Sequence, residues 1–188
     1  LTGLPKPTLF RLTETLCELG LLRYSDRLSK YVPGVGLLNL ASPVLARMTM
    51  RQFARPQMME LANYMGGQIQ IGVGSGRQLV LVELANGMDN KVFTPEIGVG
   101  ISLSRTATGL PEAEREAYLS DLTAHDPARA ALLRERLDDA RRELAEHGFC
   151  RSHGDLHREI QSIAVPMSQR QDGESWVFAA SLPTYNPK

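Results

Sequence analysis

The sequence predicts a mixed α/β (α+β) protein in which a small basic module precedes a larger domain built on an antiparallel sheet. Leucines recur at helical spacing over residues 3–22, directly ahead of a short basic hairpin. Apolar and polar residues alternate over 68–73, and a second strand-like run follows at 78–84. Two further helical segments, the second ending near residue 147, and an apolar strand at 175–183 complete the predicted order of elements.

The first predicted helix is amphipathic. Its apolar side carries Leu9, Leu12, Leu16 and Leu19. Prolines at its start cost little because the first N–H groups of a helix have no partner within the helix, and Gly20 suits the left-handed position that ends it.

The first turn of this helix carries Lys6, Thr8 and Arg11 on its polar side. Such a turn can enter the major groove of DNA, with N–H groups and Thr8 on phosphate and Arg11 near base edges. The alternative is a solvated helix face with no partner.

Two short strands around a polar turn follow the helix. The strands are predicted at 21–24 and 28–32, and the segment carries the cations Arg23, Arg27 and Lys30. A helix followed by a basic hairpin is typical of the end of a winged helix-turn-helix domain.

These residues resemble the IclR family of bacterial transcription regulators. The stretch Leu-Pro-Lys-Pro-Thr-Leu-Phe-Arg-Leu at 4–12 is similar to the family's recognition helix, and Tyr-Val-Pro-Gly at 31–34 is similar to the end of its wing. Pro7 stands where the family commonly has Ser or Thr. The resemblance implies double-stranded operator DNA as a partner, with the chain divided into a partial winged helix-turn-helix (1–34), a linker helix (35–48) and a GAF-like effector-binding domain (49–188).

Composition and charge agree with this division. Five Lys and Arg residues face three acids in the first 34 residues, whereas the remaining 154 hold 16 bases and 18 acids. The two cysteines, Cys17 and Cys150, indicate a reducing compartment rather than a disulfide scaffold. We find no apolar run of membrane-spanning length and no signal peptide, so the sequence predicts a cytoplasmic protein.

The linker segment shows helical spacing through Val35, Leu38, Ala41, Leu45 and Met48. Pro43 is expected to kink or break this helix at about Ala41. The resemblance implies that the linker contributes to a homodimer, and tetramers are common in the family; the alternative is an ordinary core helix.

The larger domain begins with another helical stripe that ends at Gly66-Gly67. Its members, which we assign to packing, are Met50, Phe53, Ala54, Met58, Leu61, Ala62 and Met65. Ala-Arg-Pro at 54–56 resembles the family's Arg-Pro helix.

The strands at 68–73 and 78–84 are predicted to form an antiparallel hairpin around Gly-Ser-Gly at 74–76. The continuous apolar run of the second strand favours a position inside its sheet. A third strand is predicted at 90–94. The glycines lack the Gly-x-x-x-x-Gly-Lys pattern of a phosphate loop, so nucleotide binding is not expected.

Residues 97–109 resemble a family motif that leads into the effector pocket. The resemblance makes Ile97, Val99, Ile101, Leu103, Thr106 and Ala107 candidate effector contacts. Small residues there allow backbone N–H groups to approach an anion, although a tight packing contact is the alternative. Gly109 runs directly into Leu110, where the family continues its helix, so we expect residues to be missing between them.

Two helices are predicted next, over 111–122 and 127–147. The second has Leu133, Leu137, Ala140 and Leu144 inward and a charged outer side, and Gly148 caps it. The outer charges indicate a solvated face.

The last segments supply the remaining candidate effector contacts. Residues 160–166 resemble the family's second pocket signature, with Ser162 where some members have cysteine, and Ser152 lies just before it. In the strand at 175–183, Ser181 matches a pocket serine and Ala179 replaces a polar residue. The apolar lining favours an aromatic or bulky member among small organic acid effectors.

The sequence therefore predicts a DNA-binding regulator, repressor or activator, that is not an enzyme and uses no cofactor. One alternative is a sensor module without DNA binding. Another is a zinc hydrolase using Cys150, His153 and His157, whose spacing allows metal ligation but lacks a fourth ligand. We also expect residues before Leu1, to support the first helix, and after Lys188.

Overall fold

The computed structural model describes residues 3–75, 78–88, 95–102, 112–153, 158–167 and 173–184. The chain forms two compact units, Leu1–Thr49 and Met50–Lys188, which are described separately. None of the helices in these described ranges is both long and apolar enough to cross a membrane.

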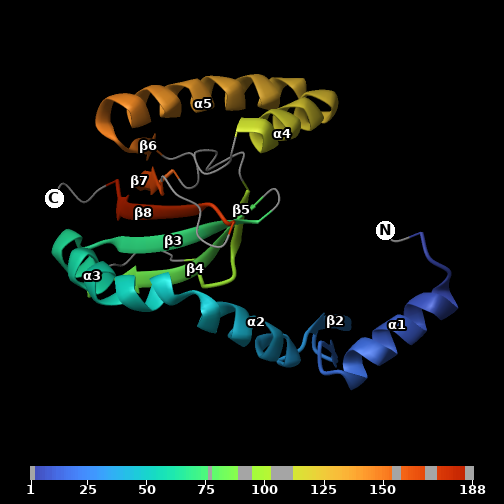
Figure 1. The fold of residues 1–188 in the computed structure, drawn as a ribbon. Helices are drawn as coiled ribbons and strands as arrows, with labels where there is room; N and C mark the ends of the chain where they lie inside the picture. Colours follow the sequence, from blue (N-terminus) through green and yellow to red (C-terminus); the bar gives the residue numbers. More distant parts are fainter. Residues whose placement is uncertain are drawn as a thin grey trace. The chain divides into compact units, whose positions relative to one another are not determined.

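The first unit contains helix α1 (Lys6–Glu18), strands β1 (Leu22–Ser25) and β2 (Lys30–Pro33), and helix α2 (Gly36–Arg47), shown in blue to cyan in Figure 1. Proline occupies the first turn of α1, and Gly20 has φ of 70° just after the helix. The strands pair antiparallel, which confirms the predicted hairpin; residues 26–29, predicted partly as strand, form its turn.

Three glycines close the base of the hairpin against the end of α1. The Gly34 N–H donates to the Leu21 carbonyl at 2.8 Å and the Gly36 N–H donates to the Gly20 carbonyl at 3.0 Å. A Cβ added at Gly34 would lie 2.1 Å from the Gly20 oxygen. The absence of a side chain at Gly34 is therefore what lets the two backbones meet.

The sequence predicted a kink or a break of the linker helix at about Ala41, and the break does not occur. Helix α2 runs through Pro43 without interruption. Proline removes one N–H donor from the helix, but Pro43 and the residue four positions earlier, Asn39, are both exposed. Water can therefore hydrate the carbonyl that loses its partner, and the helix continues.

The second unit is built on a six-stranded antiparallel sheet in the order β5-β4-β3-β8-β7-β6. The strands are β3 (Gln68–Ser75), β4 (Gln78–Asn86), β5 (Gly100–Ser102), β6 (Cys150–His153), β7 (Ile160–Pro166) and β8 (Trp176–Pro183). The predicted β3–β4 hairpin is confirmed, and β4 lies inside the sheet as expected. The strand predicted at 90–94 lies outside the described residues.

Helix α3 (Thr49–Met65) lies beside β3 and β4 (Figure 1). Met58 and Ala62 are buried, as predicted, but the assignment of Phe53 and Leu61 to packing is wrong, because their exposed fractions are 77% and 45%. Phe53 projects well away from the direction of Met58 on a 100° helical wheel, and Leu61 lies at the margin of the buried arc.

Two arginines share the buried side of α3 and reach the sheet. Arg55 Nη1 lies 2.6 Å from Glu83 Oε1, and Arg51 Nη2 lies 3.0 Å from Glu83 Oε2. The Leu84 N–H also donates to Glu83 at 3.2 Å. The Glu83 side chain is only 3% exposed, so these contacts compensate a buried charge and fix α3 on β4.

Helices α4 (Glu112–His125) and α5 (Pro127–His147) lie near the β6 end of the sheet (Figure 1). The bounds of α5 agree with the prediction, while α4 extends three residues beyond the predicted end at 122. Leu119, Leu133 and Leu137 form the core between the two helices. Asp126 caps α5 by accepting from the Arg129 N–H at 3.1 Å, and Gly148 ends it with φ of 77°.

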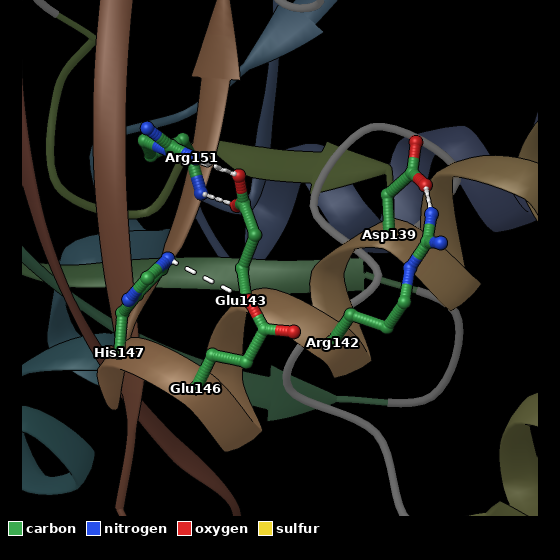
Figure 2. A network of polar contacts seen from close by, with 6 residues as sticks. All are labelled: Asp139, Arg142, Glu143, Glu146, His147 and Arg151. Carbon is green, nitrogen blue, oxygen red and sulfur yellow. Dashed lines mark hydrogen bonds and ion pairs between the residues drawn. The ribbon is translucent and has the colours of Figure 1, made fainter.

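An ion pair anchors α5 to β6 (Figure 2). Glu143 accepts from the backbone N–H of Arg151 at 2.7 Å and from its Nε at 2.8 Å. The backbone hydrogen bond from Arg151 is the largest cause that lowers the pKa of Glu143 below its ordinary value. Burial, the next in size, acts in the opposite direction, and the Arg151 side chain and His147 add to the lowering. The remaining pairs in Figure 2, Arg142 with Asp139 and His147 with Glu146, lie on the exposed surface of α5.

Candidate functional sites

The first candidate site is the exposed start of α1. Lys6 and Arg11 are exposed, Thr8 is half-buried, and the first turn contains no acidic residue. Free N–H groups and a positive helix end favour an anion at this position. Thr15, one turn further along α1, donates its hydroxyl to the Arg11 carbonyl at 3.0 Å.

The hairpin adds cations to the same unit. Arg23 pairs with Val32 and Ser25 pairs with Lys30 across the strands, so Arg23 and Lys30 project from one side of the ribbon. Arg27 is exposed in the turn. On the opposite side, Tyr24 and Tyr31 make an edge-to-face contact with ring centroids 5.3 Å apart. The hairpin thus has one cationic and one aromatic side.

The second candidate site is a row of polar residues that crosses five strands of the sheet. Direct cross-strand pairing links Ser152 with Ser162, Ser162 with Ser181, Ser181 with Gln68, and Gln68 with Asn86. Directly paired residues project from the same face of a sheet. Three serines predicted from separate segments are therefore brought together, and two residues that the sequence analysis did not select complete the row.

Hydrogen bonds connect most of this row. Ser162 Oγ lies 2.9 Å from Ser181 Oγ, and Gln68 Nε2 donates to Asn86 Oδ1 at 2.9 Å. Gln70, two residues along β3 on the same face, donates through Nε2 to Ser181 Oγ at 3.0 Å and to Gln68 Oε1 at 2.7 Å. Gln68 and Gln70 are buried.

Apolar residues continue the same face away from the serines. Leu79 and Val177 form a buried cluster with Ala164, and Ile101 pairs directly with Leu79. Ala179 pairs with both Gln70 and Ala164, next to the serine row. The face is thus polar at one end and apolar at the other.

The other predicted effector contacts are not brought into this row. Ile97 and Val99 lie in the turn before β5 and are exposed. Leu103, Thr106 and Ala107 lie outside the described residues.

The structure describes only part of the group Cys150, His153 and His157 that the sequence offered as an alternative zinc site. Cys150 and His153 are the two ends of β6, and the side chain of His153 is not among the described ones. Cys150 is buried, with its thiol 3.2 Å from the Ala164 carbonyl, and His157 lies outside the described ranges. Among the residues whose side chains are described, no cluster of three metal-ligating groups occurs.

Sequence comparison identifies two domains in the chain. The IclR helix-turn-helix domain matches residues 1–26, and the bacterial transcriptional regulator IclR C-terminal domain matches residues 42–186. The HTH-type transcriptional regulator TsaQ1/TsaQ2 of Comamonas testosteroni is 30% identical over an alignment of 192 residues, gaps included, that covers 98% of this chain and 69% of that protein. The chain belongs to the IclR family.

Solved structures of IclR regulators agree with this assignment. The IclR family regulator from Brucella abortus superposes with a TM-score of 0.83 at 31% identity, over 100% of this chain and 73% of that one. An IclR homolog from Microbacterium hydrocarbonoxydans, solved with 4-hydroxybenzoate, has a TM-score of 0.67 at 19% identity, over 99% of this chain and 79% of that one. The second likeness shows the fold alone.

Membership of the IclR family confirms the predicted architecture and the predicted class of function. The protein combines winged helix-turn-helix elements with a GAF-like domain, and it is a DNA-binding transcriptional regulator rather than an enzyme. The match to the helix-turn-helix domain also disfavours the sensor without DNA binding.

Proposed function

We propose that this IclR regulator changes its affinity for operator DNA when a small organic acid binds to the polar row of the sheet. The row is the observation that carries the proposal, because it gathers hydroxyl and amide groups from five strands on one face. A buried polar group costs free energy unless it is paired. A cluster of this kind beside an apolar surface is typical of a small-molecule site.

The chemistry of this face favours a ligand with one polar and one apolar end. Ser162 and Ser181 would hold a carboxylate, and Leu79 and Val177 would contact an apolar body. An aromatic acid has this shape. The 4-hydroxybenzoate bound by the Microbacterium homolog supports this class of effector.

The start of α1 and the hairpin would contact the operator. We place Lys6, Thr8 and Arg11 in the major groove and Arg23, Arg27 and Lys30 on phosphates beside it. Affinity for DNA should then fall steeply with salt, since each neutralised phosphate releases counterions.

Helix α2 would join two copies into a homodimer in the cytoplasm. Leu37, Leu40 and Val44 recur at helical spacing and are 40%, 61% and 55% exposed. No charged residue occurs between Lys30 and Arg47. An uncharged apolar helix surface of this kind is typical of an interface. Effector binding would act through linkage, by favouring one arrangement of the paired DNA-binding units.

A gel shift and an anisotropy titration of the intact protein on the DNA flanking its own gene test this function. We expect one acid of a panel including 4-hydroxybenzoate and pyruvate to change operator affinity by about 5- to 150-fold, the usual range of allosteric coupling. Ser162→Ala should reduce this response and leave basal DNA affinity unchanged. Ser120→Ala, on the exposed surface of α4, is the matched control.

The same titration separates the two halves of the proposal. Lys30→Ala should weaken binding on all DNA sequences and reduce the slope of log affinity against log salt by about one. Absence of specific retardation at low salt would contradict the assignment of these residues to DNA. Retardation that no acid changes would contradict the effector class.

A further inference from the structure

The side chains behind the serine pair form a continuous hydrogen-bonded chain on four strands. It runs from Asn86 on β4 through Gln68 and Gln70 on β3 to Ser181 on β8 and Ser162 on β7. Gln68 is 4% exposed and Gln70 is 8% exposed. The order of donors in such a chain decides what its last member offers to a ligand.

The direction of the chain is set at Gln70. An amide nitrogen can only donate, and it carries two hydrogens. Gln70 Nε2 uses both, one towards Gln68 Oε1 at 2.7 Å and one towards Ser181 Oγ at 3.0 Å. Gln68 in turn donates through Nε2 to Asn86 Oδ1, and this hydrogen bond keeps the Gln68 side-chain oxygen turned towards Gln70. Ser181 therefore has to accept at this end.

The serine pair then has one hydroxyl hydrogen to spare. Ser162 and Ser181 share one hydrogen bond of 2.9 Å, which uses one of their two hydrogens. Within the described part of the chain, no protein acceptor takes the other hydrogen. Because Gln70 donates to Ser181, it uses a lone pair of the Ser181 hydroxyl and not its hydrogen. The serine pair therefore keeps one hydrogen available for a bound molecule.

We propose that Gln70 is a positioning residue that makes the Ser162–Ser181 pair a hydrogen-bond donor, and thereby selects effectors that end in a carboxylate. Gln68 and Asn86 hold the Gln70 amide in the required orientation. The inference rests on the proposed effector site. It extends it by assigning the preference for an acid to a residue that need not touch the ligand.

Substitution by glutamate reverses the chain. The ionised carboxylate of Gln70→Glu accepts only, so Ser181 must donate to it and Ser162 must donate to Ser181. Both hydroxyl hydrogens are then used, and the pair offers only lone pairs to a ligand. Gln70→Leu removes the donor without supplying an acceptor, so the pair loses its fixed direction but keeps a hydrogen.

The test compares each acid with the alcohol of the same skeleton, by isothermal titration calorimetry of the intact protein. The probe pairs are 4-hydroxybenzoate with 4-hydroxybenzyl alcohol, and pyruvate with hydroxyacetone. The measured quantity is the ratio of the two dissociation constants within a pair. An alcohol can donate or accept, so it tolerates the reversed site, whereas the acid loses a charge-assisted hydrogen bond.

We expect Gln70→Glu to lower the preference for the acid by at least about tenfold, in line with a hydrogen bond to a charged group, and Gln70→Leu to lower it less. Gln161→Glu and Gln161→Leu, on the opposite face of β7, are matched controls and should leave the ratio unchanged. The charge of Gln70→Glu also repels an acid directly, so the uncharged Gln70→Leu decides the test: a purely structural role for Gln70 would weaken acid and alcohol equally in that variant. If Gln70→Glu does not fold, an unchanged ratio in Gln70→Leu overturns the inference.

The outcome also separates this inference from the proposed function. If the unsubstituted protein binds neither acid, the proposed effector class is wrong, and the role of Gln70 is overturned with it. If it binds an acid, and the ratio of dissociation constants in both Gln70 variants equals that of the unsubstituted protein, the effector class stands and only the role of Gln70 is refuted.

Discussion

Replacing Glu83 by glutamine tests whether a buried charge holds α3 on the sheet. The Glu83 carboxylate is 3% exposed and contacts Arg55 at 2.6 Å and Arg51 at 3.0 Å. Glutamine keeps nearly the same volume and an oxygen that can accept from the Leu84 N–H. The substitution therefore removes the charge and little else.

The magnitude follows from the burial of the partners. Breaking a buried ion pair costs about 3–5 kcal/mol, because the remaining charge loses its compensation. The Arg55 side chain is 57% exposed and can turn to water, whereas that of Arg51 is 15% exposed and cannot do so fully. We therefore expect the lower end of the range, about 3 kcal/mol in the free energy of unfolding. This corresponds to a fall of about 6–12 °C in Tm for a chain of this size.

Urea denaturation followed by circular dichroism and by Trp176 fluorescence measures this loss. Asp139→Asn is the matched control, because Asp139 pairs with Arg142 on the exposed side of α5. An exposed pair contributes about 0–1 kcal/mol, so the control should change little. A loss below about 1 kcal/mol for Glu83→Gln, equal to that of an exposed pair, would refute the argument that the charge is required.

Three further substitutions test other parts of the structure. Gly34→Ala would place a Cβ 2.1 Å from the Gly20 oxygen, so it should destabilise the hairpin unit by about 1–3 kcal/mol and weaken DNA binding, as thermal melting and a gel shift would reveal. The lowered pKa of Glu143 contributes stability that is present above the pKa of this group in the unfolded chain and is lost as pH falls through its pKa in the folded protein. Glu143→Gln should therefore flatten the acid side of a curve of unfolding free energy against pH. An unchanged curve would contradict the role of Glu143 as an anchor. Leu40→Asp should shift sedimentation from dimer towards monomer while Asn39→Asp does not, and equal behaviour of the two would argue against α2 as the interface.

Local signals predicted the elements of this protein well. Proline at the start and a glycine after the end marked both α1 and α5. A helix tolerates a residue without an N–H in its first turn, and it often ends at a residue with a left-handed backbone. Alternation predicted the β3–β4 hairpin. The break considered at Pro43 does not occur, because the cost of one lost hydrogen bond depends on whether water reaches the freed carbonyl, which the sequence does not state.

The candidate sites were predicted less evenly. Ser152, Ser162 and Ser181 were selected from separate motifs, while Gln68 and Gln70 were seen only as the polar half of an alternating strand. Their sequence signal was the two-residue spacing that puts both on one face. That spacing does not say whether the polar face is turned to solvent or buried.

The sequence by itself determined most of the helices and strands and the ends of some of them, such as α5, since capping, periodicity and turn residues act over a few positions. Only the tertiary structure decided which faces are buried and which residues meet. Gln70 and Ser181 are 111 positions apart, and Arg55 and Glu83 are 28 apart. Contacts over such separations depend on strand order and register, and these are set by the packing of the whole sheet rather than by any one segment.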